Sequence, residues 1–503
     1  MFDRAIVVLD YGSQYSQLIV RIIREIGYFS RLYRPEELGD IPTPAAVILS
    51  GGPRSTSEED APDVDFDYLR SLEVPVLGIC YGMQLLNLKW GGSIQPGTTR
   101  EYGPARLYPC GSNSLLEGVS DSQVWMSHSD TCIPAEGAEV LAKNEEGIPV
   151  ALRWAPDWYG IQFHPEVSHS EQGKEILANF LQRVEQPPVF EMESFREQLV
   201  EQIREEVGSR EVICGVSGGV DSSVLAVLLR AAEVRARYLF VNNGLLRKGE
   251  VEEVEAQFTE FGIELETIDA SEAFLSGLAG VTDPEEKRKI IGKTFVDVFF
   301  SAAGEIELLA QGTLYPDVIE SATSGSMAST IKTHHNRVPQ IMELASQGKV
   351  LEPLQELFKD EVRALGRILG LSEKAVGRHP FPGPGLAVRC PGAVTEERLE
   401  QIRAADAIFI ECLRSWNLYG EVWQAYAAVL PCLTVGVKGD ERAYEHPVVL
   451  RAVSSVDAMT AEWVRLPSDF LAEVSNRILN EVPGINRVLY DISTKPPASI
   501  EWE

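Results

Sequence analysis

Residues 215–223, GVSGGVDSS, lie between two apolar runs, EVIC at 211–214 and VLAVLLRAA at 224–232. An apolar run, a glycine-rich loop and a second apolar run predict a strand, a turn and a helix. Glycines let backbone N–H groups approach phosphate oxygens, and the N-terminus of the following helix adds positive potential. The stretch therefore predicts a phosphate-binding loop in an α/β domain.

This loop differs from the ATPase P-loop, in which a lysine follows the glycines. Here Asp221 follows, with Ser222 and Ser223 behind it. Such a loop suits a pyrophosphate group with Mg²⁺ held partly by a carboxylate, so Asp221 is a candidate magnesium ligand. The alternative is an ordinary glycine turn in which the Asp and Ser side chains cap the helix.

The length and composition bound the class of protein. A chain of 503 residues is too long for one core, which predicts two to four domains. No apolar run approaches the roughly 20 residues of a membrane span. The first residues, MFDRAIVVLDYG, lack the basic start and cleavage site of a signal peptide. We therefore expect a cytoplasmic protein without a membrane partner.

Charge and cysteine usage exclude further classes. The net charge of −30 argues against a nucleic-acid partner, because phosphate backbones repel such a surface. A small phosphorylated ligand stays possible, since a few local Lys and Arg side chains suffice to bind it. The seven cysteines form no C-x-x-C pair, which argues against a disulfide framework or a zinc site. We also expect no redox cofactor.

The chain divides into three predicted domains. Residues 1–187 alternate strand-like and helical runs, which predicts an α/β domain with a largely parallel sheet. Residues 188–378 repeat this pattern and contain the glycine-rich loop. A dense run of prolines and glycines then opens residues 379–503, a smaller α+β domain. The clearest predicted strands are AIVVLD (5–10), AAVILS (45–50), VPVLGIC (74–80), EVICGV (211–216), RARYLFVNN (235–243) and ELLAQGT (307–313).

Cys80 is the one cysteine with a notable context. Residues 78–82, GICYG, have the form of a nucleophile elbow at a strand-to-helix turn, where the helix N-terminus would favour a thiolate. A base is then required. Residues 159–166, YGIQFHPE, predict a strand that ends at a proline. His164 and Glu166, two residues apart, would project to the same side, so that the carboxylate orients the imidazole. Backbone N–H groups of Gly52 and Tyr81 would form the oxyanion hole. The alternative is a buried structural thiol.

The order GGP (51–53), GICYGMQ (78–84) and HPE (164–166) resembles the class I glutamine amidotransferases over the whole first segment. The resemblance implies that glutamine is hydrolysed through a γ-glutamyl thioester to glutamate and ammonia. It makes Cys80 the nucleophile, His164 the base and Glu166 the orienting carboxylate.

The string SGGVDSS (217–223) resembles the signature of the PP-loop ATP pyrophosphatases. This resemblance implies adenylation, in which a substrate oxygen attacks the α-phosphorus of ATP and pyrophosphate leaves. Lys332 and Lys359 are candidates to neutralise phosphate charge in the transition state. The full set of expected ATP-binding residues is Ser217, Gly218, Gly219, Val220, Asp221, Ser222, Ser223, Val241, Gly312, Lys332 and Lys359.

Over essentially its full length the chain resembles the glutamine-hydrolysing GMP synthetases, also through RHPFPGPGLAVR (378–389) and KPPASIEWE (495–503). The resemblance implies that XMP, ATP, glutamine and water become GMP, AMP, pyrophosphate and glutamate through an adenyl-XMP intermediate. It further implies Mg²⁺ with the ATP substrate and a homodimer formed by the third domain. The XMP-binding residues that it implies are Arg247, Gln424, Arg487, Lys495, Ile500 and Glu501.

Two alternatives stay open from the sequence. One is a non-catalytic protein that senses nucleotide or glutamine, although Cys80, His164 and Asp221 are all present. The other is a PP-loop amidotransferase acting on a different carbonyl substrate. Substrate dependence of pyrophosphate release separates these cases.

Overall fold

Short, fully buried strands form the centre of the first unit of the chain. In the computed structural model β1 (Ile6–Leu9) pairs in parallel with β2 (Ser30–Tyr33) and β3 (Ala46–Leu49), and β4 (Val76–Ile79) and β9 (Trp158–Ile161) continue the parallel array. Every residue of β1, β3, β4 and β9 is buried. Parallel strands covered on both faces have this continuous apolar character, as the sequence predicted.

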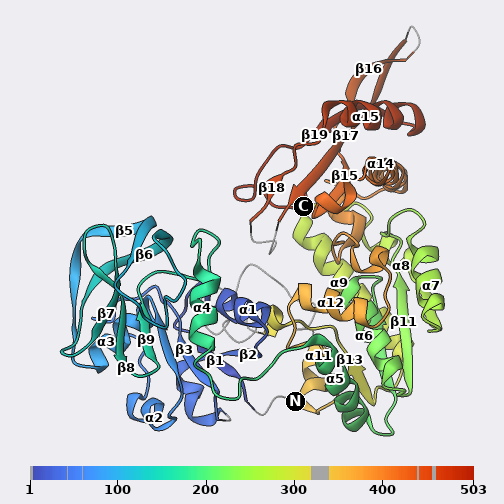
Figure 1. Cartoon of the computed structure of the whole chain (residues 1–503). Coiled ribbons are helices and arrows are strands. Elements are labelled where there is room, and N and C mark those ends of the chain that lie inside the picture. The colour runs from blue at the N-terminus through green and yellow to red at the C-terminus, as the bar shows by residue number, and fades with distance from the viewer. Residues whose placement is uncertain (1–3, 42, 59, 319–338, 439–440, 456–459) are drawn as a thin grey trace. The chain divides into compact units, whose positions relative to one another are not determined.

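The structure describes residues 4–41, 43–58, 60–318, 339–438, 441–455 and 460–503. They form two units, Met1–Phe195 and Arg196–Glu503 (Figure 1). Within the described ranges, every helix is too short or too polar to span a bilayer.

The sheet of the first unit continues past β9 with antiparallel strands, which the sequence analysis did not predict. The added strands follow in the order β8 (Pro149–Ala155), β7 (Glu139–Lys143), β5 (Ser93–Pro109) and β6 (Ser122–Ile133). Short connections without helices favour antiparallel pairing here. The helices of this unit are α1 (Ser16–Ile26), α2 (Phe66–Ser71), α3 (Tyr81–Lys89), α4 (Gly173–Leu181) and the 3-10 helix η1 (Pro35–Asp40).

The second unit contains a parallel sheet of five strands. Its order is β12 (Leu265–Asp269), β11 (Ala236–Asn242), β10 (Val212–Val216), β13 (Leu308–Ala310) and β14 (Val350–Leu351). The chain runs outward in one direction from β10 to β12 and in the other from β13 to β14. The topological switch point therefore lies between β10 and β13, where open α/β sheets bind ligands at the carboxyl ends of their strands. Helices α5 (Met192–Val207), α6 (Val220–Ala231), α7 (Glu250–Glu260), α8 (Ser271–Gly277), α9 (Pro284–Ala303), α11 (Pro339–Ser346), α12 (Lys359–Ile368) and α13 (Glu373–Val376) accompany this sheet.

The remainder of the second unit is a mixed sheet with two long helices. The central strand β17 (Glu441–Ser454) pairs antiparallel with β15 (Gln424–Val429) and β16 (Thr434–Lys438), and parallel with β19 (Ile485–Tyr490). One cluster of buried apolar side chains includes members from both sides of position 378, such as Leu245 and Phe409. The other elements are α14 (Glu396–Ser415), α15 (Ser468–Glu481), β18 (Glu462–Trp463) and the short helices η3 (Gly385–Arg389) and η4 (Tyr419–Glu421).

Arg451 on β17 holds the segment that follows β19. Its guanidinium is 1% exposed and donates to the carbonyl oxygens of Ile500 (2.8 Å), Ser499 (2.9 Å) and Ser493 (3.2 Å). It also pairs with Asp491 at 2.8 Å. A buried charge must be compensated in this way, so the sheet and the segment at 491–500 depend on one another.

We expect Arg451→Met to destabilise the second unit by about 3–5 kcal/mol, because it removes the cation that pairs with Asp491 and donates to three carbonyl oxygens. Hydrogen exchange of the β17 and β19 amides in the full chain measures this loss. Arg442→Met is the matched control, since Arg442 is exposed on the same strand. Equal exchange in the two variants would contradict the proposed anchoring.

Candidate active sites

Cys80 occupies a sharp turn between β4 and α3. Its backbone has φ 50° and ψ −104°, a conformation that non-glycine residues rarely adopt. A Cβ at Gly78 would lie 2.6 Å from the backbone of Gly82, and one at Gly82 would lie 2.3 Å from the carbonyl oxygen of Leu49. Only glycine fits at both positions, which explains the G-x-C-x-G spacing and the strain that presents the thiol at the head of a helix.

His164 and Glu166 form a buried pair beside this turn. His164 Nδ1 lies 2.7 Å from Glu166 Oε1, and each residue is 3% exposed. The sequence analysis predicted a strand that runs as far as the proline at 165, which was wrong, because β9 ends at Ile161. A turn brings the two side chains together. Among the described residues the second oxygen of Glu166 has no hydrogen-bond partner.

Gly51 shows that the imidazole and the thiol are neighbours. A Cβ built there would lie 2.9 Å from His164 Cε1 and 3.6 Å from Cys80 Cβ. Burial disfavours the imidazolium, but the Glu166 carboxylate and the hydrogen bond with Cys80 outweigh it and raise the pKa of His164 to about 11. The protonated imidazole is therefore the stable form, ready to give its proton to a leaving group.

Two backbone donors flank the thiol. In the described part of the chain, neither the Gly52 N–H nor the Tyr81 N–H donates a hydrogen bond to a protein acceptor. The Tyr81 hydroxyl donates to the carbonyl oxygen of Pro62 at 2.5 Å, and burial raises the pKa of Tyr81 to about 12. Two unused N–H groups at the head of a helix are what an oxyanion hole requires.

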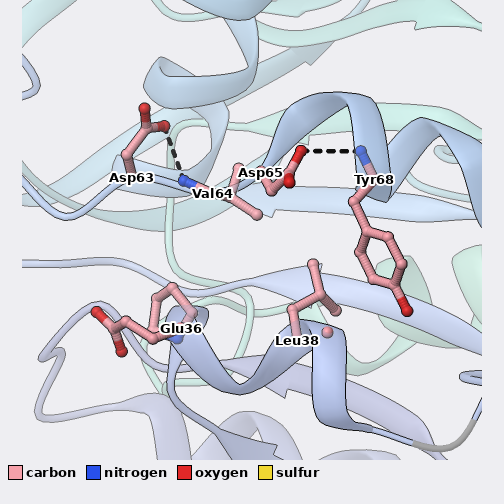
Figure 2. A pocket seen from close by; sticks show the side chains of 8 residues that line it. Glu36, Leu38, Asp63, Val64, Asp65 and Tyr68 are labelled. Atoms are coloured by element: carbon pink, nitrogen blue, oxygen red, sulfur yellow. Dashed lines mark hydrogen bonds between the residues drawn. The ribbon is translucent and has the colours of Figure 1, made fainter.

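A surface hollow elsewhere in this unit has an acidic lining that includes Glu36, Asp63 and Asp65 (Figure 2). The structure accounts for two of these acids. Asp65 caps α2 by accepting from the Tyr68 N–H at 2.9 Å, and Asp63 pairs with Lys89 at 2.6 Å. Neither Cys80, His164 nor Glu166 lines this hollow.

In the second unit the glycine-rich loop joins β10 to α6. Gly218 has φ +73°, which favours glycine. The Ser217 N–H donates to Ser222 Oγ at 3.2 Å, and Ser223 Oγ donates to the carbonyl oxygen of Gly219 at 2.9 Å. The serines therefore stabilise the loop, but no side chain caps the start of α6 at Gly219, contrary to the capping alternative. Val220 starts the helix. These bonds are compatible with a phosphate cradle.

Asp221 lies at the topological switch point. One of its carboxylate oxygens pairs with Lys359, and the other is buried without a hydrogen-bond partner among the described residues. A Cβ at Gly312, just after β13, would lie 3.5 Å from Asp221 Cβ. Val241 is buried near the carboxyl end of the neighbouring β11. Lys332, also expected to bind ATP, lies outside the described residues.

Gln424 and Glu501, two expected XMP ligands, lie in contact. Gln424 Nε2 donates to Glu501 Oε1 at 2.6 Å, and Arg389 holds the same carboxylate through two bonds of 3.1 Å each. The carbonyl oxygen of Ile500 accepts from the Tyr426 hydroxyl at 2.8 Å. The sequence analysis missed Arg389, although it is the cation that ends the proline- and glycine-rich run.

The other expected XMP ligands contact residues outside the Gln424–Glu501 pair. Arg247 is engaged with Asp406, 3.2 Å away. Arg487 faces Pro447 on β17, whereas Gln424 faces Val453, six residues further along (447 to 453), or roughly 20 Å. The backbone of Lys495 bridges to Ala461 through bonds of 2.8 and 3.0 Å. Arg487 and Gln424 therefore lie far apart along the sheet.

We expect Glu166→Gln to lower the pKa of His164, because it removes the carboxylate that opposes the effect of burial. Nuclear magnetic resonance with labelled histidine follows the titration in both proteins. The wild-type imidazole is expected to stay protonated through pH 9, and the variant to lose its proton at lower pH. An unchanged titration would contradict this electrostatic account.

The same pair makes stability depend on pH. Because the folded-state pKa of His164 exceeds its unfolded value of about 6.5, the pair stabilises the fold fully below that pH. We expect this contribution to be lost as pH rises toward 11. Urea denaturation of the wild-type chain and Glu166→Gln at several pH values measures the difference, which should shrink as pH rises. A difference that grows with pH would have the wrong sign.

Three protein families match successive parts of the chain. The family described as glutamine amidotransferase class-I matches residues 7–184, and the one described as NAD synthase matches residues 192–292. The family described as GMP synthase C terminal domain matches residues 411–502. The first match contains Cys80, His164 and Glu166, the second contains the glycine-rich loop, and the third contains Gln424 and Glu501.

Relatives match over nearly the full length. A GMP synthase (glutamine-hydrolyzing) of Thermosipho africanus (strain TCF52B) is 50% identical, with 99% of each chain covered. The protein of the same name from Chlorobaculum tepidum is 49% identical, again with 99% of each chain covered. The chain belongs to the family of glutamine-hydrolysing GMP synthases.

Proposed function

We propose that this chain aminates XMP at C2, with ATP as the activating substrate and glutamine as the nitrogen donor. The observation that carries the proposal is the presence, in one chain, of the Cys80–His164–Glu166 arrangement and of the glycine-rich loop at a topological switch point. The first chemistry releases ammonia, and the second turns an oxygen into a leaving group. Together they replace a carbonyl oxygen by an amino group.

In the glutaminase half, the Cys80 thiolate attacks the γ-carboxamide carbon of glutamine. The Gly52 and Tyr81 N–H groups stabilise the oxyanion, and His164 gives its proton to the departing ammonia. Water then hydrolyses the γ-glutamyl thioester to glutamate. Glu166 keeps the imidazole oriented and stabilises its protonated form before the transfer, in the role of the third member of a triad.

In the synthetase half, the C2 oxygen of XMP attacks the α-phosphorus of ATP, and pyrophosphate leaves. Ammonia then attacks C2, AMP departs with the oxygen, and a proton is lost to give GMP. The loop around Gly218 would hold the phosphates, and Lys359 would neutralise charge that develops during transfer. The expected roles of Val241, Gly312 and Lys332 rest on the same resemblance.

Magnesium fits this site through Asp221. Its unpartnered buried oxygen is a donor of the kind that Mg²⁺ takes, and no group of three acidic, His or Cys side chains that would complete a protein cage occurs among the described residues. One carboxylate together with substrate phosphates and water is the usual ligand set for nucleotide-bound Mg²⁺. The ion would supply positive charge on the phosphate oxygens.

We assign XMP to the cluster around Glu501, with Gln424 and the Ile500 backbone near the base or ribose. Arg247, Arg487 and Lys495 stay predicted ligands, the last two for the phosphate. The domain limits 1–187, 188–378 and 379–503 stay predictions as well, as does a cytoplasmic location.

A homodimer through the last domain is also part of the proposal. Leu433, Val435 and Val437 lie on one face at β16, and Tyr444 of β17 faces Val435. All four are more than half exposed. Exposed apolar stripes of this kind favour a protein partner.

Pyrophosphate release from Mg-ATP with XMP, with IMP or with neither tests the substrate assignment, using ammonia as the nitrogen source. XMP-dependent release with GMP formation supports it. Release that ignores XMP would favour the alternative of a different carbonyl substrate, and absence of release from folded protein would favour a non-catalytic sensor.

We expect Cys80→Ala to abolish glutamine-driven GMP formation and to leave ammonia-driven formation within about twofold of the wild-type rate, since the two reactions have separate catalytic groups. Coupled assays of GMP formation, with glutamine and with ammonia as the nitrogen source, measure the two rates. Cys110→Ala is the matched control because Cys110 is an exposed cysteine of the same unit. Equal loss with both nitrogen sources would contradict separate sites.

We expect Asp221→Asn to slow XMP-dependent pyrophosphate release by about 100-fold, or roughly 2.7 kcal/mol, because the amide is a poor magnesium ligand. Labelling of Cys80 by a chloroketone analogue of glutamine should proceed at the wild-type rate. Asp297→Asn, an exposed change on α9, is the control. Unchanged pyrophosphate release would remove Asp221 from the account.

A further inference from the structure

Arg378 and Glu250 join the glycine-rich loop to Arg247. Arg378 Nη1 donates to the carbonyl oxygen of Gly218 at 2.9 Å, and its Nη2 pairs with Glu250 Oε1. The other Glu250 oxygen accepts from the Arg247 N–H at 2.8 Å. Glu250 is 3% exposed, so both of its oxygens are committed inside the protein. Neither Arg378 nor Glu250 was singled out from the sequence.

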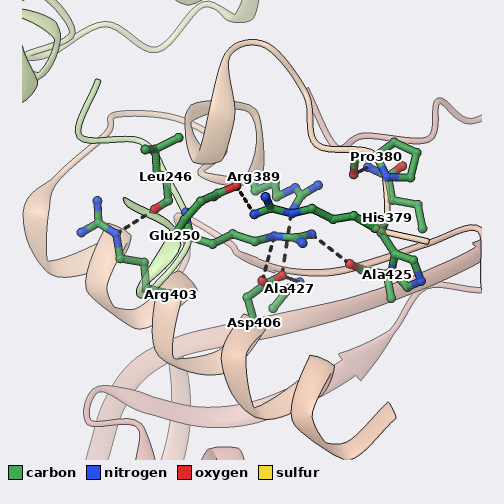
Figure 3. A network of polar contacts seen from close by, with 12 residues as sticks. Leu246, Glu250, His379, Pro380, Arg389, Arg403, Asp406, Ala425 and Ala427 are labelled. Carbon is green, nitrogen blue, oxygen red and sulfur yellow. Dashed lines mark hydrogen bonds and ion pairs between the residues drawn. The ribbon is translucent and has the colours of Figure 1, made fainter. Parts of the chain in front are cut away.

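The same network continues from Arg247 to Asp406 and Arg389, and the last two are labelled in Figure 3. Arg247 Nε lies 3.2 Å from Asp406 Oδ2, and Arg247 Nη2 donates to the carbonyl oxygen of Ala425 at 3.4 Å. The second Asp406 oxygen lies 3.8 Å from Arg389 Nη1. Arg389 Nε and Nη2 each donate a hydrogen bond to the Glu501 carboxylate. A continuous series of polar contacts therefore runs from Gly218 to Glu501.

This connection matters for the proposed reaction. Adenylation needs the C2 oxygen of XMP in line with the α-phosphorus of ATP, and a misplacement of about 1 Å can cost about 100-fold in rate. The loop and the Glu501 cluster come from segments that are distant in the sequence. A rigid polar link between them would fix the distance between the two bound nucleotides.

We propose that Glu250 and Arg378 are positioning residues that couple the ATP loop to the XMP cluster, so that each nucleotide strengthens the binding of the other. They act through Gly218 and Arg247 rather than by contact with a reacting atom. This inference rests on the proposed function, because it deepens the assignment of the same site.

The chemistry of the two side chains explains why they are hard to replace. Glu250→Gln removes the buried charge that pairs with Arg378, and leaves the guanidinium only the more distant Glu253 carboxylate, 3.8 Å away. Arg378→Lys keeps the charge but loses the planar fork, so one ammonium reaches either Gly218 or Glu250 and not both. The link is broken in each variant, although the positions of the side chains change little.

The test measures linkage in the full chain. The Kd of an α,β-methylene ATP analogue, which cannot release pyrophosphate, is measured with and without saturating XMP. In the wild-type chain we expect XMP to tighten binding at least about fivefold. In Glu250→Gln and in Arg378→Lys this ratio should fall toward one. Glu252→Gln, an exposed change on the same helix, and Arg367→Lys, in an exposed ion pair with Glu373, should keep it.

A merely structural role would weaken each nucleotide alone and leave the ratio intact, and that result would overturn the inference. A wild-type ratio of one would overturn it too. If Glu250→Gln does not fold, the Kd ratio of Arg378→Lys alone tests the inference, because that variant conserves the charge. Failure of the proposed function is recognised separately, since the wild-type chain would then bind no XMP and release no pyrophosphate in response to it.

Discussion

A guanidinium buried away from water must be matched by carboxylates, and that of Arg389 is fully buried. Burial opposes its charge, but Glu501 and Asp406 outweigh this and raise the pKa of Arg389 above its ordinary value. The ion pairs of Arg389 with Asp406 and Glu501 hold three segments together. These are the loop that contains η3, the helix α14 and the segment that carries Glu501. The faces of Phe381 and Tyr426, 5.1 and 4.3 Å away, complete its surroundings.

The proposed chemistry depends on this arrangement. Arg389 fixes the Glu501 carboxylate, to which Gln424 also donates, and these are two of the residues assigned to XMP. Through Asp406 and Arg247, the same charge is linked to the glycine-rich loop where ATP would bind. In the first unit, backbone strain positions the reactive group instead. The strained turn at Cys80 places a thiol at a helix N-terminus beside a buried imidazole.

Local patterns made much of this predictable. Buried apolar strands, the glycines around Cys80 and the loop before α6 are each determined by residues close together in the sequence, where steric rules apply directly. Arg378 contacts Gly218 across 160 residues and Glu250 across 128, and no local pattern encodes such a pair. The turn that joins His164 to Glu166, taken for a strand, and the antiparallel strands β5 to β8 were missed because tertiary pairing decides them.

The most direct test of the central claim follows one oxygen atom. XMP labelled with ¹⁸O at C2 is incubated with the full chain, Mg-ATP and ammonia, and the AMP and water are analysed by mass spectrometry. The account predicts that the label appears in the phosphate of AMP, because the C2 oxygen attacks the α-phosphorus and departs with it. Label found in water, with unlabelled AMP, would contradict adenylation of XMP.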